Sequence, residues 1–151
     1  MHNSLIPNLM VDDVNKTALF YQNILGFKFV VGIADAEAEM QEGNIVMEFK
    51  EGEKLDWANL KLDPEDPSSA EFMFQSRKSL EADVTALKGV SIGASQILYL
   101  HTDDADKQFN SLKDKVEVLQ EPITRFYGLR EWYMRDNNGY ILCFGQNMEQ
   151  D

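Results

Sequence analysis

The chain nearly repeats itself at an offset of 91 residues, which is the step from Ile6 to Ile97. Residues 5–21 read LIPNLMVDDVNKTALFY, and residues 96–112 read QILYLHTDDADKQFNSL. Each copy is a short apolar run, an acidic turn and then a helix with apolar residues three or four positions apart. Two copies of one supersecondary unit predict a pseudo-symmetric domain with a cleft between the copies, and such a cleft suits a small molecule.

The bulk composition limits the classes of partner. The chain of 151 residues carries a formal net charge of −12, which repels nucleic acid and anionic membranes, so neither is expected as a partner. No apolar stretch approaches the roughly 20 residues of a membrane span, and the first residues lack the pattern of a signal peptide. Cys143 is the one cysteine, so no internal disulfide can form and the expected compartment is the cytoplasm.

The length predicts a single domain over residues 1–151. Within it, module one is expected over about residues 4–75, a bridge over about residues 76–95, and module two over about residues 96–147. No second domain and no low-complexity segment is recognisable.

The helix of each module is expected to begin at its acidic pair. Asp12 or Asp13 is placed to cap the first helix, and Asp103 and Asp104 hold the same place in the second copy. We expect the first helix to run to about Ile24. Its inward stripe is predicted to consist of Val14, Ala18, Tyr21 and Leu25.

The segments between these elements give weaker signals. Residues 34–53 are acidic and are predicted to form a hairpin or an extended strand pair with a turn at Glu42-Gly43-Asn44. Ser79 is predicted to cap a short helix in the bridge.

Module two is expected to close with strands joined by turns. Residues 116–119 are predicted to form a strand that is followed by a loop through Pro122. The sequence Asp136-Asn137-Asn138-Gly139 predicts a tight hairpin turn before the last strand, because Asn and Gly tolerate positive φ angles.

Two segments resemble a known superfamily. VDDVNKTALFYQNILGFKFV is similar to the opening of a vicinal oxygen chelate module, and FYGLREWYMRDNNGYILCFGQ resembles its closing hairpin. This superfamily includes glyoxalase I, extradiol dioxygenases, fosfomycin-resistance enzymes and bleomycin-binding resistance proteins. The resemblance implies an α+β fold of two βαβββ modules, whose curved sheets together wrap a pocket, and a homodimer. It does not imply one activity, because the scaffold hosts several chemistries.

The resemblance also implies where a divalent metal would be held, but this chain lacks most of the ligands. The positions on the two first strands, usually His, are Ile6 and Ile97, and the position on the final strand, usually Glu, is Cys143. The closing strand of module one leaves the matching position open among three residues, which are Glu48, Glu71 and Met73. A divalent ion needs three or more N, O or S donors, so no metal and no other cofactor is expected.

Strand alternation predicts which side chains face the pocket. The expected wall is apolar and aromatic with a few polar groups, as small-molecule sites usually are. Adjacent Trp132 and Tyr133 cannot both face inward, and any of these aromatics could instead fill the core. The predicted ligand-binding residues are Asn8, Met10, Trp57, Glu71, Met73, Gln75, Tyr99, His101, Tyr127, Trp132 and Cys143.

Two function classes follow. The first is a metal-free protein that sequesters a partly aromatic or cationic small molecule, like the bleomycin-binding proteins, without making or breaking a bond. The alternative is a glyoxalase-like or dioxygenase-like enzyme, either metal-dependent or using Glu71 or His101 as general base. Cys143 is expected to be a neutral wall residue, since nothing near it in the sequence would lower the pKa of its thiol. The identity of the ligand, any turnover and the mode of dimerisation stay open.

Overall fold

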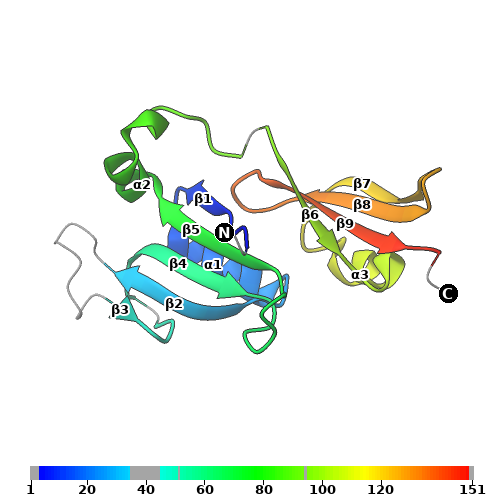
Figure 1. Cartoon of the computed structure of the whole chain (residues 1–151), viewed down its shortest axis with the longest axis horizontal. Helices are drawn as coiled ribbons and strands as arrows, with labels where there is room; N and C mark the ends of the chain where they lie inside the picture. The colour runs from blue at the N-terminus through cyan, green and yellow to red at the C-terminus, as the bar shows by residue number, and fades with distance from the viewer. Residues whose placement is uncertain (1–3, 35–44, 51, 94, 150–151) are drawn as a thin grey trace. The chain divides into compact units, whose positions relative to one another are not determined.

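The computed structural model describes residues 4–34, 45–50, 52–93 and 95–149 (Figure 1). By internal packing the chain divides into two units, Met1–Val90 (unit 1) and Ser91–Asp151 (unit 2). The boundary assigns most of the predicted bridge to unit 1. Each unit has one sheet. The expectation of a single domain with one shared pocket stays a prediction.

Unit 1 is a five-stranded sheet with a helix on one face (Figure 1). The strand order is β1-β5-β4-β2-β3, in which β1 runs parallel to β5 and the other neighbours are antiparallel. The elements of unit 1 are β1 (Asn8–Val11), α1 (Val14–Asn23), β2 (Lys28–Ala34), β3 (Ile45–Val46), β4 (Leu55–Lys61), β5 (Glu71–Ser76), α2 (Arg77–Asp83) and a 3₁₀ turn (Thr85–Leu87).

Unit 2 repeats this topology with four strands in the order β6-β9-β8-β7. Again the first strand, β6, is parallel to the last, β9, and the remaining pairs are antiparallel. The elements of unit 2 are β6 (Ile97–His101), α3 (Ala105–Leu112), β7 (Glu117–Thr124), β8 (Leu129–Arg135) and β9 (Ile141–Asn147). The predicted α+β fold of two βαβββ modules is therefore confirmed, and β3 is the addition that unit 1 carries.

The two long helices begin in the same way. Asp13 accepts a hydrogen bond from the backbone N–H of Lys16 at 3.0 Å, and Asp104 accepts one from Lys107 at 2.9 Å. Both aspartates are extended N-caps, as their spacing in the repeat predicts. The second aspartate of each acidic pair is thus the cap.

Each core lies between the helix and one face of the sheet. In unit 1, Tyr21 of α1 packs edge-on against Phe27 and Phe72 and at a tilt against Phe74. In unit 2, α3 contacts β7, β8 and β9, and Trp132 stacks on Phe144 with ring centroids 5.0 Å apart. Neither α1 nor α3 covers the opposite face of its sheet, and we call this face the open face of that unit.

Two expected boundaries were wrong. The cap of α2 is Ser76 instead of Ser79, because the backbone of Ser76 is still extended and its hydroxyl accepts from the N–H of Ser79 at 3.3 Å. β7 runs on to Thr124 through Pro122, where the sequence predicted a loop. β7 is the edge of the sheet, where a proline without an N–H costs no ladder hydrogen bond.

The remaining expectations have mixed outcomes. The turn at Asp136 to Gly139 is confirmed, with the N–H of Asp136 donating to the carbonyl of Tyr140 at 2.9 Å. In the acidic stretch 34–53, Ile45–Val46 forms β3, but the expected turn at Glu42-Gly43-Asn44 lies outside the described residues. No helix in the described part of the chain combines the length and apolar character needed to cross a membrane.

Candidate functional site

The open face of unit 2 is defined by the register of its strands. Tyr99 on β6 pairs with Cys143 on β9, and Cys143 pairs with Tyr133 on β8. One step along the strands, His101 and Glu131 both pair with Gly145. Because alternate residues of a strand share a face, these side chains lie on one surface, opposite the core residues of β8 and β9.

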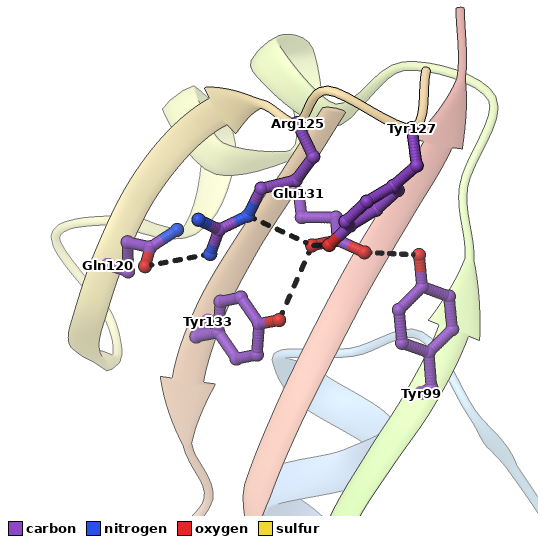
Figure 2. Close-up of polar contacts among 6 residues, drawn as sticks. All are labelled: Tyr99, Gln120, Arg125, Tyr127, Glu131 and Tyr133. Carbon is purple, nitrogen blue, oxygen red and sulfur yellow. Dashed lines mark hydrogen bonds and ion pairs between the residues drawn. The ribbon is translucent and has the colours of Figure 1, made fainter. Parts of the chain in front are cut away.

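A buried carboxylate organises this surface. Glu131 is only 2% exposed, and its Oε1 accepts a hydrogen bond from the Tyr99 hydroxyl at 2.9 Å. Its Oε2 accepts from the hydroxyl of Tyr127 at 2.9 Å, from Nε of Arg125 at 3.3 Å and, at the longer distance of 3.4 Å, from the hydroxyl of Tyr133. Figure 2 shows the donors converging on this carboxylate from β6, β8 and the loop between β7 and β8. We call these five residues the Glu131 cluster.

The donors keep the carboxylate ionised. Burial acts to raise the pKa of Glu131, but the hydrogen bonds from Tyr127, Tyr99 and Arg125 outweigh it and hold this pKa below its usual value. The same contacts act in the other direction on the donors. Burial and the hydrogen bond to Glu131 raise the pKa of Tyr99, and the hydrogen bond to Glu131 raises the pKa of Tyr127. At neutral pH the cluster therefore consists of an ionised carboxylate that accepts hydrogen bonds from neutral phenols and from Arg125.

Arg125 and Tyr127 reach Glu131 because the β7–β8 hairpin turns tightly. The N–H of Gly128 donates to the carbonyl of Arg125 at 3.1 Å, and the N–H of Arg125 donates to the carbonyl of Leu129 at 2.7 Å. Gly128 has a φ of 84°, which closes a hairpin of this kind with a left-handed residue. Phe126 at the tip is fully exposed, and its ring lies edge-on to that of Tyr127.

Gln120 on β7 completes the surroundings of Arg125. Its Oε1 accepts from Nη2 of Arg125 at 3.2 Å (Figure 2), while its buried Nε2 has no hydrogen-bond partner among the described residues. The guanidinium is thus held between an amide oxygen and a carboxylate. This arrangement fixes the position of the guanidinium next to Glu131.

Tyr99 can reach across β9 to Glu131 only because residue 145 is glycine. A Cβ atom built on Gly145 would overlap the hydroxyl and the ring of Tyr99. Tyr99 remains 42% exposed and Tyr127 49% exposed, so both tyrosines stay accessible from outside although their hydroxyls are bonded to Glu131.

Cys143 lies between Tyr99 and Tyr133, its partners on the two neighbouring strands, and is fully buried. Burial raises the pKa of its thiol to about 11, so the side chain is a neutral thiol at physiological pH. A neutral, buried thiol is poorly suited to act as a nucleophile, and the role of Cys143 in the pocket wall stays a prediction.

His101 is exposed at the end of β6, with its ring edge-on to that of Tyr99 at 5.6 Å between centroids. It borders a cavity of about 460 Å³ in unit 2 that Asp103, Leu129 and Gln146 also line. His101 is therefore available to a ligand, as a candidate base must be.

On the open face of unit 1, hydrogen bonds within the protein engage the polar side chains among the predicted ligand-binding residues. Asn8 donates to Oε1 of Gln75 at 2.8 Å, and Nε2 of Gln75 donates to Ser79 at 2.8 Å and to Asp83 at 2.7 Å. These bonds tie β1 and β5 to α2. The amide groups of Asn8 and Gln75 are thus engaged within the protein.

The other residues predicted on this face have different surroundings. Glu71 accepts from Nδ2 of Asn59 at 2.9 Å, so the first candidate base is paired with an amide. Trp57 is half-buried opposite Gln75, whereas Met10 is almost fully buried. Glu48 is exposed just after β3.

The face assigned to Trp132 was wrong. Its ring is fully buried on the helix side of the sheet, stacked on Phe144 and edge-on to Phe109, and its Nε1 donates to Gln108 of α3 at 3.1 Å. Its neighbour Tyr133 takes the place on the open face. The parity of the strand required one of the two to be in the core, and the larger indole fills the space beneath α3.

The strand registers also show which residues of the two units correspond to each other in the repeat. Met73 pairs with Asn8, and Cys143 pairs with Tyr99, which is the residue that matches Asn8 in the repeat. Met73 therefore corresponds to Cys143, which favours it over Glu71 as the counterpart of the family's final-strand ligand in module one.

The family-type metal does not fit this donor set. Ile6 and Ile97 have no lone pair, Met73 is a thioether, and the thiol of Cys143 is neutral because burial raises its pKa. Among the described residues, no group of three or more His, Cys, Asp or Glu side chains is placed to hold an ion.

Sequence reasoning missed the centre of the cluster. Glu131, Arg125 and Tyr133 of the cluster were not among the predicted site residues, and neither was the neighbouring Gln120, although Tyr99 and Tyr127 were. A usable signal was present, because Glu131 is two positions before Tyr133 and must share its face. A charged residue at an inward position of an otherwise apolar strand is a candidate for a buried polar network.

Comparison with known proteins agrees with this architecture. A family model described as "Glyoxalase/Bleomycin resistance protein/Dioxygenase superfamily" matches residues 5–144. A search of curated proteins found no match.

Several solved structures have the same fold. A protein of unknown function from Agrobacterium tumefaciens str. C58 is 18% identical, with a TM-score of 0.67 over 97% of this chain and 94% of that chain. A glyoxalase/bleomycin resistance protein/dioxygenase from Nocardioides is 12% identical, with a TM-score of 0.65 over 100% and 88%. A bleomycin resistance determinant encoded on the transposon Tn5 is 18% identical, with a TM-score of 0.57 over 97% and 98%. At such identities the likeness concerns the fold alone.

Proposed function

Since this chain belongs to the Glyoxalase/Bleomycin resistance protein/Dioxygenase superfamily, we propose that it is a metal-free small-molecule-binding protein. It captures a partly aromatic or cationic ligand on the open face of unit 2, by analogy with the bleomycin resistance determinant among its structural relatives. The mechanism is stoichiometric capture, in which no bond is made or broken.

One observation carries the proposal, namely that a buried carboxylate fixes exposed aromatic rings in place. Tyr99 and Tyr127 are each anchored to Glu131 by a hydrogen bond of 2.9 Å, while the two residues stay 42% and 49% exposed. Rings that are held in one rotamer lose little further entropy when a planar ligand stacks on them. The exposed Phe126 adds a third ring at the rim.

The charge of the whole chain supports a cationic ligand. With a net charge of −12, the protein raises the local concentration of cations and speeds their association. Aromatic faces attract cations within about 6 Å of the ring centroid. An acidic surface and a tyrosine wall therefore favour the same class of ligand.

The test is a binding titration with and without a chelator. Planar aromatic compounds of positive, neutral and negative charge are titrated into ¹⁵N-labelled protein, and the amide shifts of residues 97–101 and 125–133 are followed. We expect saturable shifts for at least one aromatic cation, unchanged by EDTA. Loss of binding on chelation, or no saturable shift with any compound, would contradict the proposal.

Two variants localise the site. Tyr99→Ala removes a ring of the wall and should weaken binding by roughly tenfold, the worth of one good aromatic contact. Leu62→Ala, at a residue that is similarly exposed on unit 1, should leave binding unchanged.

A second candidate function, a metal-free lyase or isomerase, is favoured by one observation. His101 is exposed and borders the cavity of about 460 Å³, where a substrate proton would be within its reach. Turnover of glyoxalase-type and dioxygenase-type substrates is compared in wild type, His101→Ala and Glu71→Gln. A rate that neither substitution lowers would remove both assigned bases.

We further propose that the protein acts as a cytoplasmic homodimer. A free, buried Cys143 suits a reducing compartment. Sedimentation equilibrium on the purified protein tests the assembly, for which a mass twice the chain mass of 17.3 kDa is expected.

A further inference from the structure

We infer that Glu131 sets the specificity of the ligand site, by fixing the tyrosine hydroxyls of the wall so that they accept but do not donate. The ligand group that such a wall selects is a hydrogen-bond donor, above all a protonated amine carried on an aromatic body. This inference rests on the proposed binding function and adds the polarity of the ligand to it.

The direction of the phenol protons follows from proton counting. A tyrosine hydroxyl has one proton to donate, and an ionised carboxylate can only accept. The hydroxyls of Tyr99 and Tyr127 both lie 2.9 Å from oxygens of Glu131, so both protons are used toward the protein interior (Figure 2). What each oxygen keeps for a ligand is lone-pair density.

This polarity is stable near neutral pH. Burial and the hydrogen bond to Glu131 raise the pKa of Tyr99, and the contact with Glu131 raises that of Tyr127, so neither hydroxyl loses its proton. The contacts with Tyr127, Tyr99 and Arg125 keep the pKa of Glu131 below its usual value despite burial, so the acceptor stays charged. A change of pH within the physiological range therefore does not turn the tyrosine hydroxyls of the wall from acceptors into donors.

The one cation of the cluster does not offset this preference. Arg125 directs Nε to Glu131 at 3.3 Å and Nη2 to Gln120 at 3.2 Å. Its charge is balanced by that of the Glu131 carboxylate, with which it forms an ion pair at 3.3 Å. An anion that approaches this ion pair is attracted by Arg125 and repelled by Glu131, so it gains little from the pair.

Such a wall predicts a specific order of affinities among ligands. An ammonium group donates up to three hydrogen bonds and is also attracted to the tyrosine rings. An alcohol donates one hydrogen bond without a charge, and a carboxylate donates none. On one and the same aromatic body, the affinities should fall from amine to alcohol to carboxylate.

The experiment uses three probes with one ring, which are 2-phenylethylamine, 2-phenylethanol and 3-phenylpropionate. Each is titrated into the full-length protein at neutral pH and followed by the amide shifts of residues 97–101 and 125–133. Wild type should bind the amine roughly tenfold more tightly than the carboxylate, as expected for one charge-assisted hydrogen bond.

Glu131→Gln tests the cause of this preference. The glutamine amide can donate to a tyrosine oxygen, which frees the phenol proton to point outward, so the amine-to-carboxylate ratio should fall toward one or invert. Glu121→Gln is the matched control, because it removes the same charge from an exposed position on the neighbouring β7. It should keep the wild-type ratio.

Tyr99→Phe provides an independent test of the preference if Glu131→Gln does not fold. It keeps Glu131 and the ring but removes one accepting oxygen, so binding of the amine should weaken while that of the carboxylate does not. An unchanged ratio in every variant that folds, or equal binding of carboxylate and amine to wild type, overturns the inference but leaves the proposed function standing. If none of the three probes shifts wild type, and no other aromatic compound does, both fail together.

Discussion

At the scale of single residues, Glu131 has more hydrogen-bond partners than any of the donors that surround it in the cluster. Four donors meet its two oxygens, and its side chain is almost completely buried. A buried charge is tolerated only when hydrogen bonds and a counter-charge replace its water shell, and Arg125 and the phenols do so here. The position therefore combines a structural and a recognition role.

This burial predicts a pH-dependent loss of stability in Glu131→Gln. Because the pKa of Glu131 in the folded protein is below its ordinary value of 4.5, the unfolded chain binds the proton first as the pH falls. The stabilising contribution is complete above pH 4.5 and is lost as the pH falls through the lowered pKa. At neutral pH the substitution should reduce the free energy of unfolding by about 2–3 kcal/mol, the worth of hydrogen bonds to a charged group.

Urea unfolding of both proteins over a series of pH values measures this difference. The gap between wild type and Glu131→Gln should narrow at acid pH, whereas Glu121→Gln should follow wild type throughout. A gap that is independent of pH would show that the loss comes from packing and not from the charge.

Gly145 predicts a second residue-scale effect, which arises from steric overlap. Gly145→Ala places a methyl group where the Tyr99 ring crosses β9, so Tyr99 must leave Glu131. We expect a loss of about 1–3 kcal/mol, typical of overpacking at a crowded site. Thermal or urea unfolding measures it.

A double-mutant cycle identifies the cause. In the Tyr99→Ala background, the same Gly145→Ala change should cost much less, because the overlapping ring is absent. Equal costs in the two backgrounds would assign the effect to the backbone of β9 instead.

At the scale of elements, the repeated acidic pair gives a matched comparison within one motif. Asp104 accepts the N–H of Lys107 as the cap of α3, whereas Asp103 is exposed and precedes the cap. Asp104→Ala should lower the free energy of unfolding by about 1 kcal/mol, and Asp103→Ala, with the same change in charge, by clearly less. Chemical denaturation of the two variants checks this, and equal losses would mean that charge rather than capping matters.

Sequence patterns predicted the elements well where the local signal was strong. The two aspartate caps, the turn before β9 and the parity of β6 follow from residues within a few positions of one another. The cap of α2 did not, because Ser76 and Ser79 are both suitable caps and only the extended backbone of Ser76 decides between them. β7 was missed in part, since Pro122 breaks a strand unless that strand is at an edge.

The candidate site was harder to predict because it depends on tertiary pairing. Tyr99 and Glu131 are far apart in the sequence, and their contact requires β9 between them and Gly145 at the crossing point. No local pattern encodes such a contact. Alternation placed Tyr99 and Cys143 on the open face, but it could not decide between Trp132 and Tyr133.

At the scale of the whole molecule, the net charge of −12 sets how a cationic ligand approaches. Long-range attraction is screened beyond about 10 Å at 0.1 M salt and beyond about 3 Å at 1 M. The association rate of 2-phenylethylamine should therefore fall severalfold between these salt concentrations, while that of neutral 2-phenylethanol should stay constant. Relaxation-based NMR exchange rates provide the measurement, and an equal response of both probes would exclude electrostatic steering.

Cys143, which lies beside the Glu131 cluster, limits the side chains that position 143 can carry. A glutamate at 143, as metal-binding relatives carry, would introduce a second carboxylate beside Tyr99 and Tyr133, where Glu131 already uses the available donors. The two carboxylates would repel each other and compete for the same phenol hydroxyls. This would raise the pKa of one carboxyl group and weaken the anchoring of the tyrosine rings. A glutamate at position 143 is therefore compatible with Glu131 and its tyrosines only at a cost to the anchoring of the rings.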